Sequence, residues 1–182
     1  MGVECTDMDK IPIKKVSAGC HKQKGFDSRG CLGTNCGDAC CRYGADFDQE
    51  SANIVFQNRK KVERLIKNKL EKCYLKVTLN DPEFLGGNAR RSRVRDGFCV
   101  FHNPHGKGCV LFVLATRGEI PIRAVPSICR LYPLTWGNGR IIVYDQIEKG
   151  CNTVIRSNKT KDSAFQTQKK AIEDIFSLGS RV

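Results

Sequence analysis

The sequence has no apolar run that approaches the roughly 20 consecutive residues a membrane-spanning helix needs, and we expect no membrane span. The first twenty residues also lack the apolar segment of a secretory signal peptide, so we expect a cytoplasmic protein in a reducing compartment. The chain contains neither a Walker phosphate-binding loop nor a G-x-S-x-G motif. Nucleotide-dependent and serine-nucleophile chemistries are therefore without support.

Cysteine is what the sequence has in excess, with 11 in 182 residues. The rest of the composition, 40% apolar and 27% charged, is ordinary for a globular protein, and the length suits a single domain over residues 1–182. Because eleven is odd and disulfides rarely persist in a reducing compartment, these cysteines indicate metal ligands or reactive thiols.

The pattern of the chain predicts an α+β fold, built as a small single domain. Two amphipathic helices are expected, one from about Gln49 to Cys73 with Asp48 or Ser51 as its N-cap, the other over residues 161–176. Short antiparallel hairpins are expected as well: the apolar runs 98–101 and 109–113 flank a Pro/Gly turn, and a strand covers 141–144. Residues 17–46 read as a metal-organised cysteine-rich loop, and residues 80–95 as a polar connection.

Eight cysteines lie in predicted loops or at strand ends. The glycine-rich loop carries a C-x4-C-x3-C-C pattern, and four more follow along the chain; the set is Cys31, Cys36, Cys40, Cys41, Cys99, Cys109, Cys129 and Cys151. Thiolates are soft ligands suited to zinc and to iron–sulfur clusters. No C-x2-C pair occurs, so the spacing excludes the commonest zinc fingers without naming the metal. Adjacent Cys40 and Cys41 favour two neighbouring sites or one site with a spare thiol.

Other chemistry-bearing residues admit more than one interpretation. Cys73, on the apolar face of the long predicted helix, is expected to be a small core side chain, while the roles of Cys5 and Cys20 are open. His102 and His105 are interpreted as exposed turn residues, with metal ligation or activation of a nucleophilic cysteine as alternatives. Arg42 and Arg130 each follow a cysteine, and either hydrogen bonding to sulfur or plain solvation would suit them.

Several of these motifs together resemble a known family. Cys36-Gly37-Asp38-Ala39-Cys40-Cys41, Phe98-Cys99, Gly108-Cys109 and the run from Pro126 to Pro133 are similar to the YkgJ-type cysteine-cluster proteins, which are described as zinc- or iron-chelating domains. The resemblance covers residues 31–151 and implies that the eight cysteines bind metal. Many members space their first cysteines as C-x2-C-x2-C-C, whereas the spacing from Cys31 is wider here.

Three functional hypotheses follow. The first is a metal-binding protein that holds an iron–sulfur cluster or zinc, and a cluster would suit an electron-transfer role, as an oxidoreductase or as the accessory subunit of one. The second is a structural zinc module that binds a protein partner. The third, nucleic-acid binding, rests on the net charge of +12 and on two basic runs, 90–95 and 59–61. No known nucleic-acid-binding motif accompanies these runs, so we interpret them as a solvated basic face and do not expect a nucleic-acid partner.

Overall fold

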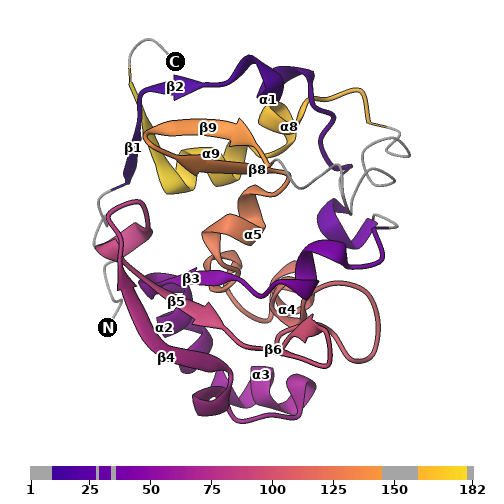
Figure 1. The fold of residues 1–182 in the computed structure, drawn as a ribbon. Helices are drawn as coiled ribbons and strands as arrows, with labels where there is room; N and C mark the ends of the chain where they lie inside the picture. Colours follow the sequence, from indigo (N-terminus) through magenta and orange to yellow (C-terminus); the bar gives the residue numbers. More distant parts are fainter. Residues whose placement is uncertain (1–9, 28, 34–35, 145–159, 180–182) are drawn as a thin grey trace.

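The computed structural model describes residues 10–27, 29–33, 36–144 and 160–179. Its helices and several small sheets confirm the predicted α+β fold (Figure 1). None of the helices in these ranges is long and apolar enough to cross a membrane. Cys5 and Cys151 lie outside the described residues.

One group of elements packs into what we call the first core, which draws its buried side chains from Ala45 to Val125. An antiparallel sheet in the order β3-β5-β4 contributes residues 46–48, 88–92 and 74–80. Three helices, α2 (Gln49–Gln57), α3 (Arg59–Ile66) and α4 (Val110–Thr116), supply the rest of this core, with the 3-10 turns η3 (Leu70–Lys72) and η5 (Ile122–Ala124). Its largest fully buried side chains include Phe47 and Phe101.

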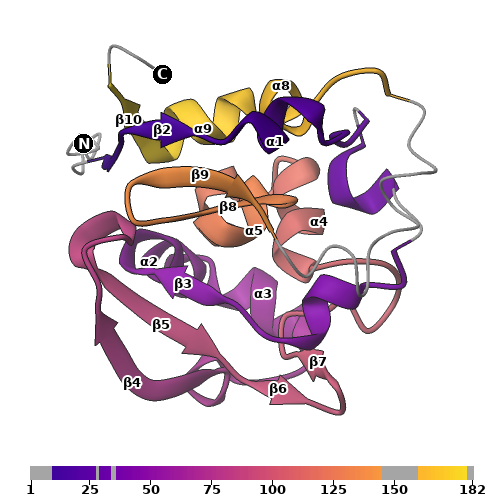
Figure 2. The ribbon, with the colours of Figure 1, turned by 45° about the horizontal axis from the view of Figure 1, so that its top comes forward.

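The second core joins the two ends of the chain. Strand β1 (Ile11–Ile13) pairs in parallel with β10 (Phe176–Leu178), and β2 (Lys15–Val16) pairs in parallel with β9 (Arg140–Val143). The β8 (Leu134–Gly137) and β9 strands form a hairpin that lies between α1 (Ala18–Lys22) and α5 (Ser127–Leu131) (Figures 1 and 2). Helices α8 (Ala164–Thr167) and α9 (Lys169–Ile175) complete this core.

The long helix predicted over Gln49–Cys73 is wrong in its extent. Asp48 caps the start as predicted, because its carboxylate accepts the Ser51 backbone N–H at 3.0 Å. The helix breaks at Asn58, whose side-chain amide donates to the Ile54 carbonyl and so competes with the backbone ladder. Helix α3 then ends at Lys67, which adopts a left-handed backbone with φ 51°.

The predicted hairpin around residues 98–113 is only partly present. Its first arm becomes the short strand β7 (Phe98–Cys99), which pairs with β6 (Val94–Arg95), and a single bridge joins His102 to Cys109. The second arm is the beginning of α4, since a short run that is apolar at every position fits a buried helix as well as a strand.

Two other segments are more structured than predicted. Residues 17–46 contain α1 and the 3-10 turns η1 (Gly30–Gly33) and η2 (Ala39–Arg42), so the region is not continuous loop. Residues 80–95 hold β5, and η4 (Leu85–Gly87) precedes it. The strand predicted at 141–144 is confirmed as β9, and the C-terminal helix over 161–176 is present as α8 and α9, followed by β10.

Candidate functional site

Six of the predicted cysteines line one cavity of about 240 Å³. They come from η1, η2, β7, the N-cap of α4, and α5; these residues are Cys31, Cys40, Cys41, Cys99, Cys109 and Cys129. Much of the remaining lining is aromatic, contributed by residues such as Phe26, Phe47 and Tyr132. The fold therefore brings thiols from residue 31 to residue 129 to a common surface.

The thiols of η1 and η2 interact with one another directly. Cys31 is hydrogen-bonded to Cys36 and Cys40, and Cys40 is also hydrogen-bonded to Cys41. The thiols of Cys31 and Cys41 lower the pKa of Cys40 to about 4, while the same contacts raise the pKa values of Cys31 and Cys41. These hydrogen bonds favour the thiolate form of Cys40, which is the form of cysteine that binds metal.

The three thiols on the opposite side of the cavity stay protonated. Burial raises the pKa of Cys109 to about 12 and also raises the pKa of Cys99. Desolvation by the surrounding protein raises the pKa of Cys129 as well, although part of its surface is accessible to solvent. Each of these thiols also feels the charge of Cys40. A cation in the cavity would reverse this balance, because it stabilises several thiolates at once.

A single carboxylate connects the two sides. Asp38 lies between Cys36 and Cys40 in a left-handed backbone conformation with φ 55°. One oxygen accepts the Gly108 backbone N–H at 3.0 Å, and the other lies 2.9 Å from Nε2 of His102. Because Gly108 precedes Cys109 and the His102 backbone N–H donates to the Cys99 carbonyl, Asp38 ties the η2 cysteines to these two.

Ring contacts support the same junction. The His102 ring stacks on Phe98 at 4.3 Å between centroids, and the Arg42 guanidinium lies 4.8 Å from the centre of the Phe98 ring. His102 lines the cavity and is half-buried, so the interpretation as an exposed turn residue is wrong for His102 but holds for His105. Arg42 is exposed, as the solvated alternative predicted, and its guanidinium also contacts the Phe98 ring.

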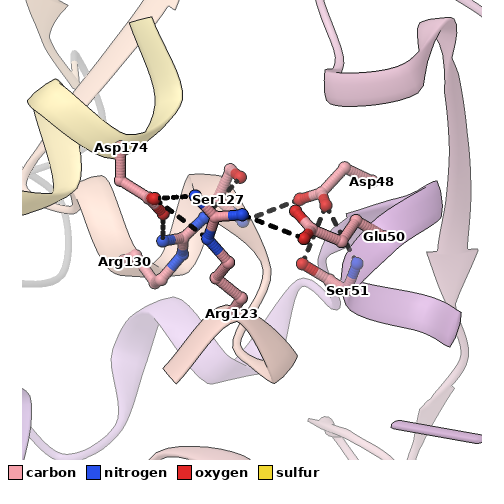
Figure 3. Close-up of polar contacts among 7 residues, drawn as sticks. All are labelled: Asp48, Glu50, Ser51, Arg123, Ser127, Arg130 and Asp174. Carbon is pink, nitrogen blue, oxygen red and sulfur yellow. Dashed lines mark hydrogen bonds and ion pairs between the residues drawn. The ribbon is translucent and has the colours of Figure 1, made fainter. Parts of the chain in front are cut away.

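A polar network fixes α5, which carries Cys129 (Figure 3). The Ser127 backbone N–H donates to Asp48 at 3.1 Å, which ties the start of α5 to the cap of α2. The Arg130 side chain, 4% exposed, pairs with Asp174 of α9 and donates to the Ser127 hydroxyl. Arg130 is therefore neither solvated nor bound to sulfur, and both interpretations of it from the sequence are wrong.

The remaining cysteines lie away from the cavity. Cys36 is not among the residues that line the cavity, but it packs against Phe26 and is hydrogen-bonded to Cys31, which both line it. Cys73 is fully buried in the first core, as predicted, and its thiol donates to the Lys69 carbonyl. Cys20 is buried in the second core, where its thiol donates to the Ile141 carbonyl.

Two residues at the site were not predicted. Asp38 sits inside the cysteine motif and could have been suspected from that position alone. Ser92, which lies 3.3 Å from the Cys99 sulfur and accepts the Ala45 backbone N–H, carries no signal in the sequence.

A second cavity of about 460 Å³ adjoins the first. Cys31 and Cys129 line both cavities, and the exposed surface of Cys129 faces this shared space. Among the residues that the structure describes, no group of three or more His, Cys, Asp or Glu side chains is arranged to hold a metal ion. The thiols thus surround the space without converging on one point.

Comparison of the chain with family models, with curated proteins and with solved structures finds no match in any of the three.

Proposed function

We propose that the protein binds an iron–sulfur cluster, or zinc in its place, through the thiolates around the 240 Å³ cavity. The observation that carries this proposal is the meeting of six cysteines from distant segments on one cavity. Cys40, Cys41, Cys99, Cys109 and Cys129 are free thiols there, so they are available as ligands. The resemblance to the YkgJ-type cysteine-cluster proteins points to the same chemistry.

The packing around the cysteine motif supports the proposal. Of the residues in η1 and η2, only Ala39 is assigned to a buried apolar cluster, and the one buried member of that cluster is Phe26, which is 8% exposed. Such a segment buries too little apolar surface to become ordered by that alone. A structural metal contributes on the order of 10 kcal/mol, which is enough to order the segment.

A cluster and a single zinc ion make different demands on the thiols. Four sulfurs that bind one zinc all lie about 2.3 Å from the same centre, whereas cluster ligands attach to different irons around a larger core. The six cysteines that line the cavity are more than the four that either group needs. A cluster would supply one-electron redox chemistry, so an electron-transfer or accessory role follows from it.

The decisive experiment is a metal and sulfide count on protein purified without oxygen. We expect stoichiometric iron and sulfide, and a visible absorption that dithionite bleaches. Cys40→Ala and Cys129→Ala should lose this metal, because both residues line the cavity. Cys20→Ala and Cys73→Ala serve as matched controls and should retain it, because these thiols are buried in the two cores.

Each other outcome contradicts part of the proposal. A colourless protein with stoichiometric zinc would exclude the electron-transfer role and leave a structural zinc module that binds a protein partner. Absence of any stoichiometric metal would overturn metal binding altogether. Equal metal loss in all four variants would show that the cavity cysteines are not the ligands.

A further inference from the structure

Three exposed cations lie on α3 and at its C-terminal end, and we call them the α3 stripe: Lys60, Arg64 and Lys67. Lys60 and Arg64 are four residues apart and so lie on one side of the helix, and Lys67 is the residue that ends it in a left-handed backbone conformation. Val62, on the opposite side of the helix, is fully buried in the first core. Helix α3 lies at the end of the molecule opposite β2 (Figure 1).

The stripe has no acidic partner within the described part of the chain. Lys60, Arg64 and Lys67 are exposed, and none of the ion pairs between described residues includes them. The acidic side chains nearby are already engaged: Glu63 accepts the Leu70 backbone N–H and pairs with Lys69, and Glu71 pairs with Arg59.

The basic runs noted in the sequence behave differently. Arg91 pairs with Asp46 at 2.7 Å and also donates to the Tyr43 carbonyl, and Arg93 donates to the Tyr74 carbonyl. Arg59 pairs with Glu71. These three arginines have partners within the fold, whereas Lys60, Arg64 and Lys67 have no ion pair among the described residues.

The stripe belongs to a strongly positive part of the chain. Residues 59–95 contain twelve lysines and arginines against four acidic residues, a net charge of +8 out of the chain's +12. A concentration of one sign creates a local potential that attracts a polyanion and speeds its association.

We propose that the α3 stripe binds the phosphate backbone of nucleic acid without regard to sequence. A protein partner requires an apolar or aromatic centre in its interface, but the apolar residues of α3, including Leu65 and Ile66, pack against the first core. A phosphate backbone needs only spaced cations that release its counterions. The α3 stripe supplies spaced positive charge without an apolar centre, which is what a phosphate backbone requires.

The test is the salt dependence of binding to labelled single-stranded and duplex oligonucleotides of about 20 nucleotides, between about 50 and about 200 mM salt. The triple variant Lys60→Gln, Arg64→Gln, Lys67→Gln should reduce the slope of log K against log salt by about 2 to 3. The matched control is Lys22→Gln, Lys161→Gln, Lys170→Gln, which removes the same charge from exposed positions on or near α1, α8 and α9. The control should keep the wild-type slope.

Three results would overturn the proposal. The first is no binding at the lowest salt, and the second is an equal slope for the two triple variants. The third is binding of polyglutamate or of anionic vesicles as tight as that of the oligonucleotides, since that would mark the stripe as a general polyanion surface. Metal content does not enter this measurement, so its outcome is separate from that of the proposed metal binding.

Discussion

At the scale of single residues, the carboxylate of Asp38 connects the two sides of the cavity. Its two oxygens contact Gly108 and His102, whereas its backbone belongs to the segment that carries Cys40. Aspartate is also one of the few side chains that adopt a left-handed backbone at low cost. The residue therefore sets both the local turn and its attachment to the other side of the cavity.

Asp38→Asn should weaken this junction while preserving the turn. Asparagine tolerates the same backbone conformation but removes the charge that strengthens both hydrogen bonds. We expect the free energy of unfolding to fall by about 1–3 kcal/mol, and bound metal to pass to a chelator about tenfold faster. Urea unfolding and the rate of metal release measure the two effects.

Asp96→Asn provides the matched control. Asp96 also has a left-handed backbone, with φ 52°, but it is exposed in the turn between β6 and β7. Its replacement should change stability by less than about 0.5 kcal/mol. Similar losses in the two variants would show that Asp38 acts only through its turn.

The cysteines of the site could be predicted from the sequence, but their supporting residues could not. Cys99, Cys109 and Cys129 were predicted as ligands from their places in turns and at strand ends, and all three line the cavity. The partners of Asp38 and Arg130 lie 64 and 44 residues away in the sequence. No local pattern specifies contacts of that range.

At the scale of elements, Asp174 of α9 joins three other parts of the fold (Figure 3). It pairs with Arg130 of α5 and with Arg123 of η5, and Arg123 continues to Glu50 of α2 at 3.1 Å. Burial opposes ionisation of Asp174, but hydrogen bonds from the two arginines outweigh it and lower the pKa of this carboxyl. The ionised form is thus part of the packing of α5 against α9.

Asp174→Ala should destabilise the protein by about 3 kcal/mol in urea unfolding, because it leaves the buried Arg130 without its charged partner. Since folding lowers the pKa of Asp174, its contribution is present above the unfolded value near 3.8 and is lost as the pH falls through the lower folded value. The difference between wild type and variant should therefore shrink in acid.

The neighbouring residue gives a control in the same helix. Glu173 is 59% exposed, and Lys169 is its one ion-pair partner among the described residues, so Glu173→Ala should cost less than about 0.5 kcal/mol. A comparable loss from Glu173→Ala would mean that the helix itself, and not the network with α5, determines the effect.

Elements were predicted well where a pattern is long and amphipathic, and poorly where it is short or uniformly apolar. The start of α2 at Asp48 follows from its cap, but the break at Asn58 depends on one side chain that competes for a backbone carbonyl. A short apolar helix was expected from residue 113, but the first residues of α4 were assigned to a strand, because its seven residues include no charged side chain that would reveal a period.

At the scale of the whole molecule, the cavity lies where the two cores meet. Phe47 and Phe101 of the first core line it, as does Leu134 of the second. A ligand in this space therefore contacts both cores, and its binding contributes to the stability of each.

Removal of metal by a chelator under reducing conditions should lower the thermal midpoint by about 10 °C or more. Amide hydrogen exchange should become faster in residues 36–42 and 98–109, which carry cavity cysteines, and stay slow in the β8–β9 hairpin. A midpoint that does not change on metal removal, or faster exchange confined to β8–β9, would contradict the placement of metal in this cavity.

The α+β class could be predicted because it requires only that helices and strands be recognised, and not how the strands pair. The pairing of β1 with β10 could not, because each strand has three residues and its partner lies at the other end of the chain. Short strands carry too little pattern to identify a partner.

The two cores also differ in how much of the chain must be synthesised before each can form. The buried residues of the first core end at Val125. The second core forms only after Phe176 has been synthesised, because Ile11 and Ile13 of β1 pack there beside β10. During translation the first core can assemble while β1 still lacks its neighbour. A nascent chain whose first 125 residues have left the ribosome should therefore contain a folded first core and an unpaired β1. The backbone groups and apolar side chains of β1 would then be open to a chaperone.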